Sequence, residues 1–341
     1  KTTLKETLSF FLLKKFKTSF SQKSYNNYLG VLLSILNLDL KSKYAVFELG
    51  TNNFGEIRIL TNLVKPLEIF ITNIQSTHLE NFENKKNIAK EKSEIFFYKY
   101  NNLRKRIYLN IISESEKIIL QKAKIQKNLK IVLINNKSKK YFIKKIIDKN
   151  NYFEVYFSIK NKIIKIYTDN IIESRLYNLL FCYAFFVENK IDDKIISKFF
   201  DKLNPVDGRG LQHKICINNK NVNVIDESYN ANPDTMLQSV QYFSNLRLPP
   251  NKKILILGDM NELGKISYKM HIKLLNNIEL YRFKLVLLCG EFLRRSVSKI
   301  KLQNNHYVYL ENKLKMINFI KNNIHKNDII LIKCSNKTEV N

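Results

Sequence analysis

The chain has 341 residues, with 58 Lys and Arg against 30 Asp and Glu, a formal net charge of +28, 45% hydrophobic residues and no Trp. This length is typical of two domains, each with a buried core. The hydrophobic content excludes a disordered tail, and 8 Gly and 5 Pro are too few for a collagen-like or linker-rich chain. The four cysteines have no disulfide-framework or zinc-ligand spacing, so we expect a cytoplasmic protein.

The large positive charge first suggests binding to nucleic acid or to an anionic membrane. The lysines are spread along the whole chain, however, and Asn and Ile are also abundant, which is typical of an A+T-rich coding sequence. A nucleic-acid docking surface would concentrate basic residues on one helix or face. No apolar run reaches the roughly 18 residues of a membrane span. We therefore expect anionic small-molecule substrates, and neither nucleic acid nor a membrane as partner. We also expect a monomer.

Strands and helices alternate from the beginning of the chain. The opening KTTLKETLSFFLLKKF has apolar residues at helical spacing, which predicts a helix that begins at or just before residue 1. AVFELG (45–50) and IFITNI (69–74) predict strands, and residues 84–97 predict a helix. Between about 100 and 170, runs such as KIVLINN and FEVYFSI predict strands and hairpins. The alternation predicts an α/β fold with a mostly parallel sheet.

A second α/β domain is predicted after the helical stretch ESRLYNLLFCYAFFVENK. KLNPVDGRG (202–210), with its Pro and two Gly, is typical of a domain boundary. Beyond it, the predicted strands VNVIDES, KKILILGDM, FKLVLLCGE and DIILIK alternate with the predicted helix PDTMLQSVQYF and a Lys-rich helix. Asn232 and Pro233 suit the N-cap and first position of the former helix. We therefore predict domains at residues 1–204 and 205–341.

Polar residues at the start of the chain and after two predicted strands are candidates for phosphate and metal binding. Lys1, Thr2 and Thr3 are similar to the end of a G-K-[ST] phosphate loop, whose lysine binds phosphates and whose hydroxyl binds Mg²⁺. Glu48 ends an apolar strand, where a carboxylate is well placed to hold Mg²⁺, and His78 follows the next strand. Taken alone, each also fits an exposed helix start, strand end or loop.

Two segments of the second domain are candidates for nucleotide binding. In DESYNANPD (226–234), Asp226, Tyr229 and Asn230 crowd a strand end, where the base or ribose of a nucleotide would meet amides and a carboxylate. GDMNELG (258–264) follows another strand with a Gly and two acidic residues, and it fits a turn equally well.

Together and in this order, the motifs resemble those of the Mur ligases, ATP-dependent amide-bond-forming enzymes of bacterial cell-wall synthesis. The resemblance covers nearly the whole chain and is carried by KTTLKE, SYNNYLGVLLSIL, FELGTNNFGEI, TNIQSTHLENF, IAKEKSEIF, DGRG, IDESYNANPDTM and LGDMNELG. It implies a P-loop-type central ATPase domain and a C-terminal Rossmann-like domain. It also implies that the family's N-terminal uridine-nucleotide-binding domain and the phosphate-loop glycines are absent from this sequence.

The pairing of SYNANPD with GDMNELG is similar to that in members that add D-alanyl-D-alanine. The resemblance thus implies ligation of D-Ala-D-Ala to UDP-N-acetylmuramoyl-tripeptide through an acyl phosphate, with ATP and Mg²⁺ as cofactors. The alternatives are another Mur-type ligase, such as a folylpolyglutamate synthetase, and a non-catalytic, basic, nucleic-acid-binding relative. KCSN (333–336) departs from the family's usual Lys-Gly-Ser-Arg.

The resemblance also implies roles for individual residues. Catalytic roles are implied for three residues, Lys1, His78 and Lys92. Metal-binding roles are implied for Thr2, Glu48, His78 and, once carbamylated, Lys92. Contacts to ATP are implied for Lys1, Thr2, Thr3, Arg209, Asn230 and Asn232. Contacts to the substrate are implied for Asn26 and Asn27.

Overall fold

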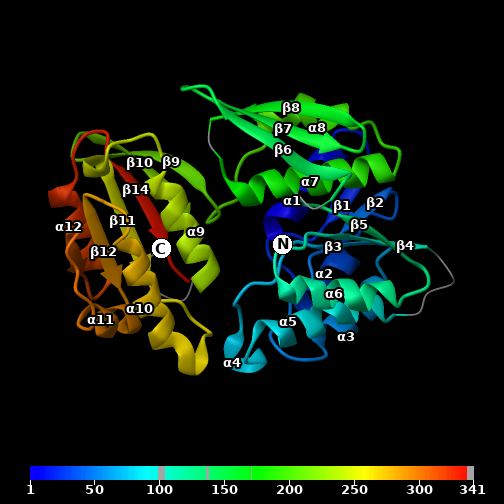
Figure 1. Ribbon diagram of the computed structural model, residues 1–341, viewed down its shortest axis with the longest axis horizontal. Helices are drawn as coiled ribbons and strands as arrows, with labels where there is room; N and C mark the ends of the chain where they lie inside the picture. Colours follow the sequence, from blue (N-terminus) through cyan, green and yellow to red (C-terminus); the bar gives the residue numbers. More distant parts are fainter. Residues whose placement is uncertain (99–103, 136–137, 170, 336–341) are drawn as a thin grey trace. The chain divides into compact units, whose positions relative to one another are not determined.

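The computed structural model describes residues 1–98, 104–135, 138–169 and 171–335. The chain divides into two units, of which unit 1 comprises residues 1–74 and 81–203 and unit 2 comprises residues 75–80 and 204–341 (Figure 1). The division after Leu203 falls inside the segment 202–210 that the sequence marks as a boundary. Residues 75–80, which the predicted domains assign to the first domain, cluster with unit 2 because Ser76 N–H donates to Asp234 at 2.9 Å.

Unit 1 begins with helix α1 (Thr2–Leu13), as predicted, and α1 buries Leu4, Leu8 and Phe11. Strands β1 (Thr18–Phe20) and β2 (Tyr44–Val46) pair in parallel, with helix α2 (Tyr28–Leu36) between them in the chain. β2 is shorter than the predicted strand 45–50. The reason is that Glu48 N–H donates to Ser21 Oγ and Gly50 N–H to Asn26 O, so the chain leaves the strand path.

A second parallel sheet of unit 1 has the order β3-β4-β5. Its strands and the helices around it are α3 (Glu56–Val64), β3 (Glu68–Ile71), α4 (Leu79–Phe82), α5 (Lys85–Lys92), η1 (Ser93–Phe96), β4 (Lys105–Leu109), α6 (Glu114–Lys124) and β5 (Leu129–Leu133). The helix predicted over 84–97 is confirmed as α5 and η1. Helix α6 lies where strands and hairpins were predicted, so that prediction was wrong for this segment. The sequence signal for α6 is the capping box of Ser113 and Glu116.

The predicted hairpins are confirmed in the antiparallel sheet β6-β7-β8 of unit 1. The elements concerned are β6 (Tyr141–Asp148), β7 (Phe153–Ile159), β8 (Lys162–Thr168), α7 (Glu173–Glu188), α8 (Lys194–Phe199) and η2 (Phe200–Lys202). The predicted long helix is α7, which packs against α1, β6 and β7 and buries consecutive residues from Asn178 to Phe186. A helix that is apolar all round is typical of a core position, and α7 forms the centre of unit 1.

Unit 2 has a sheet of order β13-β12-β11-β14-β10-β9, parallel except for the edge strand β9. Its elements are β9 (Leu211–Ile217), β10 (Lys220–Glu227), α9 (Pro233–Ser244), η3 (Pro250–Lys252), β11 (Lys253–Gly258), η4 (Gly264–Ile266), α10 (Ser267–Ile278), β12 (Leu285–Cys289), α11 (Glu291–Val297), β13 (Tyr307–Tyr309), α12 (Lys313–Asn323) and β14 (Ile329–Lys333). Asn232 and Pro233 occupy the predicted N-cap and first helical position of α9.

Replacing Phe181 by Ala tests the central role of α7. Phe181 is 1% exposed, whereas Leu36 on α2 is 80% exposed. Truncation of a buried Phe leaves a cavity, so we expect Phe181→Ala to lower the free energy of unfolding by about 3–5 kcal/mol and Leu36→Ala by about 0.5 kcal/mol or less. Urea titration followed by circular dichroism measures both. Equal losses for the two variants would contradict the assignment of α7 as the core.

Candidate functional site

A cluster of polar side chains surrounds the first turn of α1 in unit 1. Lys1 Nζ donates to Leu49 O at 3.3 Å, and Thr2 Oγ1 lies 3.3 Å from Ser24 Oγ. Asn26 Nδ2 donates to Glu48 Oε1 at 2.8 Å. A helix N-terminus presents backbone N–H groups and partial positive charge, which suits an anionic ligand. The structure therefore brings together Lys1, Thr2, Asn26 and Glu48, which come from three separate motifs.

Glu48 is the most constrained acidic group of this cluster. The residue is 4% exposed, and its Oε2 is buried without a hydrogen bond of normal geometry to any described residue. Burial opposes ionisation, but the Lys1 charge and the side chains of Asn26 and Thr2 outweigh it and hold the pKa of the carboxyl below its usual value. Glu48 is therefore a carboxylate with one buried oxygen that is available to a cation.

Lys5 holds the turn beside this carboxylate, a role that the sequence analysis missed. Lys5 lies one helical turn after Lys1 and is 3% exposed. Its ammonium donates to Ser21 O and to Lys23 O and pairs with Glu6 at 2.7 Å. The three donors of the ammonium are thus occupied, and they fix the turn that leads to Asn26. A lysine on the apolar face of the predicted helix was the available signal.

Lys92 lies at the end of α5, where its Nζ donates to Asn73 O at 3.3 Å. Burial of the amine and the neighbouring Lys1 charge, opposed by Glu116, lower the pKa of Lys92 to about 7. The influence of Lys1 on both Glu48 and Lys92 ties these residues to one site in unit 1. Thr3 follows on α1 and is half-buried.

Glu91, beside Lys92 in the sequence, also escaped the sequence analysis. Its carboxylate accepts hydrogen bonds from Gly55 N and Ile57 N, both at 2.8 Å. Glu91 thereby caps α3 from another helix and stabilises the turn that follows Glu48. Only the tertiary fold brings these groups together, so no local sequence pattern indicates this role.

His78 belongs to the segment 75–80 and is therefore described with unit 2. Its Nδ1 lies 2.6 Å from Glu262 Oε2, within the GDMNELG segment. The structure thus groups His78 with Glu262, whereas Lys1, Thr2, Glu48 and Lys92 belong to unit 1. A metal role for His78 stays a prediction.

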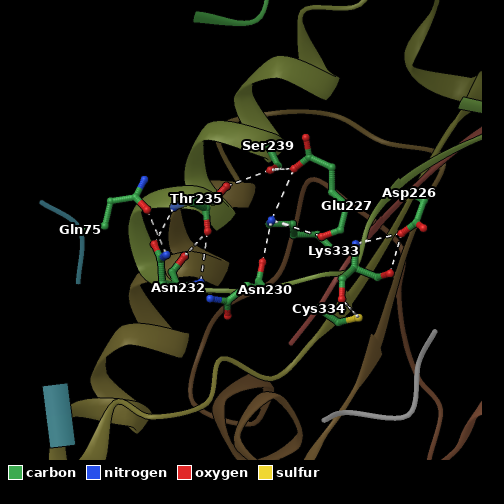
Figure 2. Close-up of polar contacts among 10 residues, drawn as sticks. Gln75, Asp226, Glu227, Asn230, Asn232, Thr235, Ser239, Lys333 and Cys334 are labelled. Atoms are coloured by element: carbon green, nitrogen blue, oxygen red, sulfur yellow. Dashed lines mark hydrogen bonds and ion pairs between the residues drawn. The ribbon is translucent and has the colours of Figure 1, made fainter. Parts of the chain in front are cut away.

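Two of the predicted binding asparagines are helix caps. Asn27 Oδ1 accepts from Gly30 N at 2.9 Å at the start of α2. Asn232 Oδ1 accepts from Thr235 N at 2.9 Å, and Asn232 Nδ2 lies 3.4 Å from Gln75 Oε1 (Figure 2). Capping explains why both positions favour asparagine. Any ligand would have to use the remaining hydrogen-bonding capacity of these amides.

Arg209 stacks on an aromatic ring beside the β10 turn. Its guanidinium carbon lies 4.1 Å from the centroid of Tyr229. The close approach requires glycine at 208, because Gly208 has φ of +68° and an added Cβ would lie 3.0 Å from Tyr229 Cβ. The sequence DGRG therefore has a structural reason for its first glycine, and it places Arg209 against SYNANPD.

The GDMNELG segment is fixed by hydrogen bonds from two helices. Asp259 accepts from Phe292 N at 3.0 Å and Leu293 N at 2.9 Å, which caps α11. The buried His271 of α10 accepts from Met260 N through Nε2 at 3.0 Å, and its Nδ1 lies 2.7 Å from Ser267 O. His271 is thus held as a neutral ring that carries its proton on Nδ1. Asp259 therefore acts mainly as a helix cap.

Across the described ranges, no group of three or more His, Cys, Asp and Glu side chains could hold a metal ion. Mg²⁺ commonly binds through one or two carboxylates together with substrate phosphates, so Glu48 and the Thr2 hydroxyl fit such an ion without a larger acidic cluster. In the same described part of the chain, no helix is long and apolar enough to cross a membrane.

Comparison with known proteins identifies the family of the chain. Residues 1–186 match the Mur ligase middle domain, and residues 214–336 match the Mur ligase glutamate ligase domain. The chain belongs to the Mur ligase family. It is 33% identical to UDP-N-acetylmuramoyl-tripeptide-D-alanyl-D-alanine ligase of Rickettsia prowazekii, over 80% of this chain and 60% of that one. It is 31% identical to the ligase of the same name from Borreliella burgdorferi, over 98% of this chain and 70% of that one.

Solved structures share the fold of this Mur ligase chain. MurF from Acinetobacter baumannii superposes with a TM-score of 0.85 at 23% identity, covering 99% of this chain and 72% of that chain. MurF from Thermotoga maritima, solved in complex with ADP, has a TM-score of 0.81 at 21% identity, with 99% and 75% covered. The predicted α/β fold class, a P-loop-type ATPase domain with a Rossmann-like domain, is confirmed by these matches.

Acid should lower the free energy of unfolding of this Mur ligase through protonation of His271. Burial lowers the pKa of His271 below its ordinary 6.5, while the Ser267 carbonyl and Asp259, at 3.6 Å, oppose the shift. In the unfolded chain, His271 therefore binds a proton more readily than in the folded chain. The stability that the neutral His271 contributes is present above about pH 6.5 and is lost as the pH falls. We expect urea unfolding to show a smaller loss between about pH 7.5 and about pH 5.5 in His271→Gln than in the wild type.

The exposed His306 provides the matched control, and His306→Gln should keep the wild-type pH dependence. If His271→Gln also loses stability on acidification as steeply as the wild type, His271 is not the responsible group.

Proposed function

We propose that this Mur ligase chain carries the ATP-dependent ligation of D-alanyl-D-alanine to UDP-N-acetylmuramoyl-tripeptide, as a cytoplasmic monomer in peptidoglycan precursor synthesis. The observation that carries the proposal is the buried Glu48 carboxylate beside Lys1 and Thr2 at the N-terminus of α1, with one oxygen that has no hydrogen bond of normal geometry to the described residues. The names of the relatives support the choice of substrates.

The reaction requires activation of a carboxylate, since its oxygen is a poor leaving group at neutral pH. The terminal carboxylate of the tripeptide attacks the γ-phosphorus of ATP, which forms an acyl phosphate and releases ADP. The amine of D-Ala-D-Ala then attacks the acyl carbon, and the resulting tetrahedral intermediate loses inorganic phosphate and a proton to give the amide. Two anions must approach each other in the first step, so the site must offset their repulsion.

Unit 1 supplies the charges for this step. Lys1 contacts the phosphates, and Thr2 and Thr3 lie at the helix start that faces them. Glu48 and Thr2 are suited to hold Mg²⁺, which when bound would neutralise charge on the phosphate oxygens. Asn26 keeps Glu48 oriented through its 2.8 Å hydrogen bond. In this proposal, Asn26 and Asn27 would contact the substrate.

Lys92 is proposed to react with CO₂. Its neutral amine attacks the carbon of CO₂, which forms an N–C bond, and one proton is released to give an anionic carbamate. A pKa of about 7 supports this step, because about half of the amines are uncharged at that pH. The product carboxylate would add a metal ligand near Lys1.

Unit 2 supplies contacts to the nucleotide in this proposal. Asn230 and Asn232 offer amides, and Arg209 offers a guanidinium held on Tyr229. His78 is kept as a candidate for the phosphate or metal side, with Glu262 as the group that orients it.

The proposed reaction predicts that ADP release depends on both substrates. The full-length protein should release ADP only when UDP-N-acetylmuramoyl-tripeptide and D-Ala-D-Ala are both present, as measured by a coupled enzyme assay. Glu48→Gln should lower the rate about 100-fold, because it removes the carboxylate that would hold Mg²⁺, whose charge would offset the repulsion between the two anions. Glu114, whose side chain is 78% exposed, provides the control, and Glu114→Gln should keep the wild-type rate.

ADP release without a requirement for the dipeptide would refute the assignment. If glutamate replaces D-Ala-D-Ala in the same assay, the chain is instead a ligase of the folylpolyglutamate synthetase type. Steeply salt-dependent DNA binding, with activity unaffected by Glu48→Gln, would favour the nucleic-acid-binding alternative.

Carbamylation of Lys92 predicts a pH-dependent adduct. With carbon-13-labelled bicarbonate, NMR should detect a carbamate that diminishes as the pH falls below about 7, since the protonated amine cannot attack CO₂. Lys92→Ala should abolish the signal and lower ADP release about 10- to 100-fold. Lys90 is exposed on the same helix, and Lys90→Ala should change neither result. A carbamate signal that persists in Lys92→Ala would assign the adduct to another amine.

A further inference from the structure

Lys333, the last residue of β14, is buried against the turn that follows β10. The residue is 6% exposed, and its Nζ donates to Asn230 O at 2.8 Å and to Glu227 O at 3.2 Å (Figure 2). The ammonium also lies 3.5 Å from Glu227 Oε2. Burial lowers the pKa of Lys333, and Glu227 opposes this. A buried ammonium persists only where such acceptors surround it, so the contacts fix both Lys333 and the turn.

The surroundings of Lys333 are themselves fixed. Glu227 and Lys333 are partners in the parallel pairing of β10 with β14. The Ser239 hydroxyl of α9 hydrogen bonds to the Glu227 carboxylate. On the other side of the turn, Ser228 N–H donates to Asp226 Oδ1 at 2.9 Å. The backbone from 226 to 230 is therefore held by two strands and one helix.

Asn230 differs from its neighbours in this turn. Its backbone carbonyl is held by Lys333, but its side chain is exposed and makes no hydrogen bond to the described residues. The side-chain oxygen of Asn232, two residues later, accepts the hydrogen bond that caps α9. The amide of Asn230 is thus presented to solvent from a rigid backbone, which is the arrangement that ligand recognition favours, because little conformational freedom remains to be lost on binding.

We propose that Lys333 is a positioning residue that holds the Asn230 amide ready for the nucleotide, through its hydrogen bond to the Asn230 carbonyl. The inference rests on the proposed function, in which Asn230 contacts ATP. Lys333 itself does not touch the nucleotide in this account. Its effect on ATP binding therefore passes through Asn230.

A double-mutant cycle on the full chain tests this dependence. The dissociation constant of ATP, with Mg²⁺ present, is measured by titration calorimetry for the wild type, Asn230→Ala, Lys333→Met and the double variant. We expect each single variant to raise the constant about tenfold, the order expected for one lost hydrogen bond. The double variant should bind as weakly as Asn230→Ala alone, since residues that act through one contact are not additive.

Lys253 provides a matched control for loss of a buried lysine in the same unit. It is 2% exposed, and its Nζ donates to Leu246 O at 2.9 Å and to Ser244 O. Lys253 begins β11, whereas Lys333 ends the neighbouring parallel strand β14, so the two lysines lie at opposite ends of adjacent strands. Lys253→Met should lower the midpoint of urea unfolding, as Lys333→Met does, but leave the ATP dissociation constant unchanged.

The outcomes separate the inference from the proposed function. Additive effects, which would give about a hundredfold loss in the double variant, would show that Lys333 acts independently of Asn230 and overturn the inference. A wild-type ATP dissociation constant in either single variant would also overturn the inference, and so would an equal loss of ATP affinity in Lys253→Met. In each of these cases, ATP binding by the wild type would leave the proposed function standing. Absence of ATP binding in the wild type would refute both.

Discussion

The requirement that a buried charge be compensated organises the first unit. Glu48 gives up solvation in a position where Lys1 and Asn26 stabilise its ionised form, and that exchange fixes the end of β2 against the start of α1. The strand ends early beside this carboxylate, because Ser21 and Asn26 accept hydrogen bonds from the N–H groups that a longer strand would use. Lys5 completes the arrangement from within the helix. The start of α1 and the end of β2 therefore stabilise each other, and Glu48 Oε2 remains without a hydrogen bond of normal geometry to the described residues.

Much of the motif chemistry is local structure. Asn27, Asn232 and Asp259 cap helices, and Glu91 caps α3 from a distance. Side chains that are used in this way hold the turns in place, and they leave few groups for a ligand. Glu48 Oε2 and the Asn230 amide are two exceptions among the described residues of these turns. A residue that caps a helix, Asn232, and a residue whose amide is exposed, Asn230, thus lie within one motif.

The sequence predicted the elements whose signals are local. α1, α7 and the start of α9 follow from apolar spacing and from Asn232 with Pro233. The grouping of Lys1 with Glu48 follows from the resemblance to the Mur ligases, because no local pattern pairs the two residues. The failure at α6 has a different origin: its capping box was present at Ser113, but Lys, Ile and Asn fill helices and strands alike in this chain. Glu91 and Lys333 act across long sequence separations, where no pattern in one sequence can pair the partners.

Lysine is so abundant in this chain that its presence at a position does not indicate a role. The groups around each lysine determine what that lysine does. Lys5 and Lys333 are each surrounded by carbonyl oxygens and a carboxylate, which contact the ammonium group. Lys92 has one carbonyl at 3.3 Å and the charge of Lys1 nearby, so its proton is held weakly. An ammonium that is surrounded by protein acceptors stabilises the local fold. An amine with few acceptors that lies near another cation loses its proton more easily, and its neutral form is a nucleophile. The same residue type thus stabilises turns at two positions and, as we propose, reacts at a third.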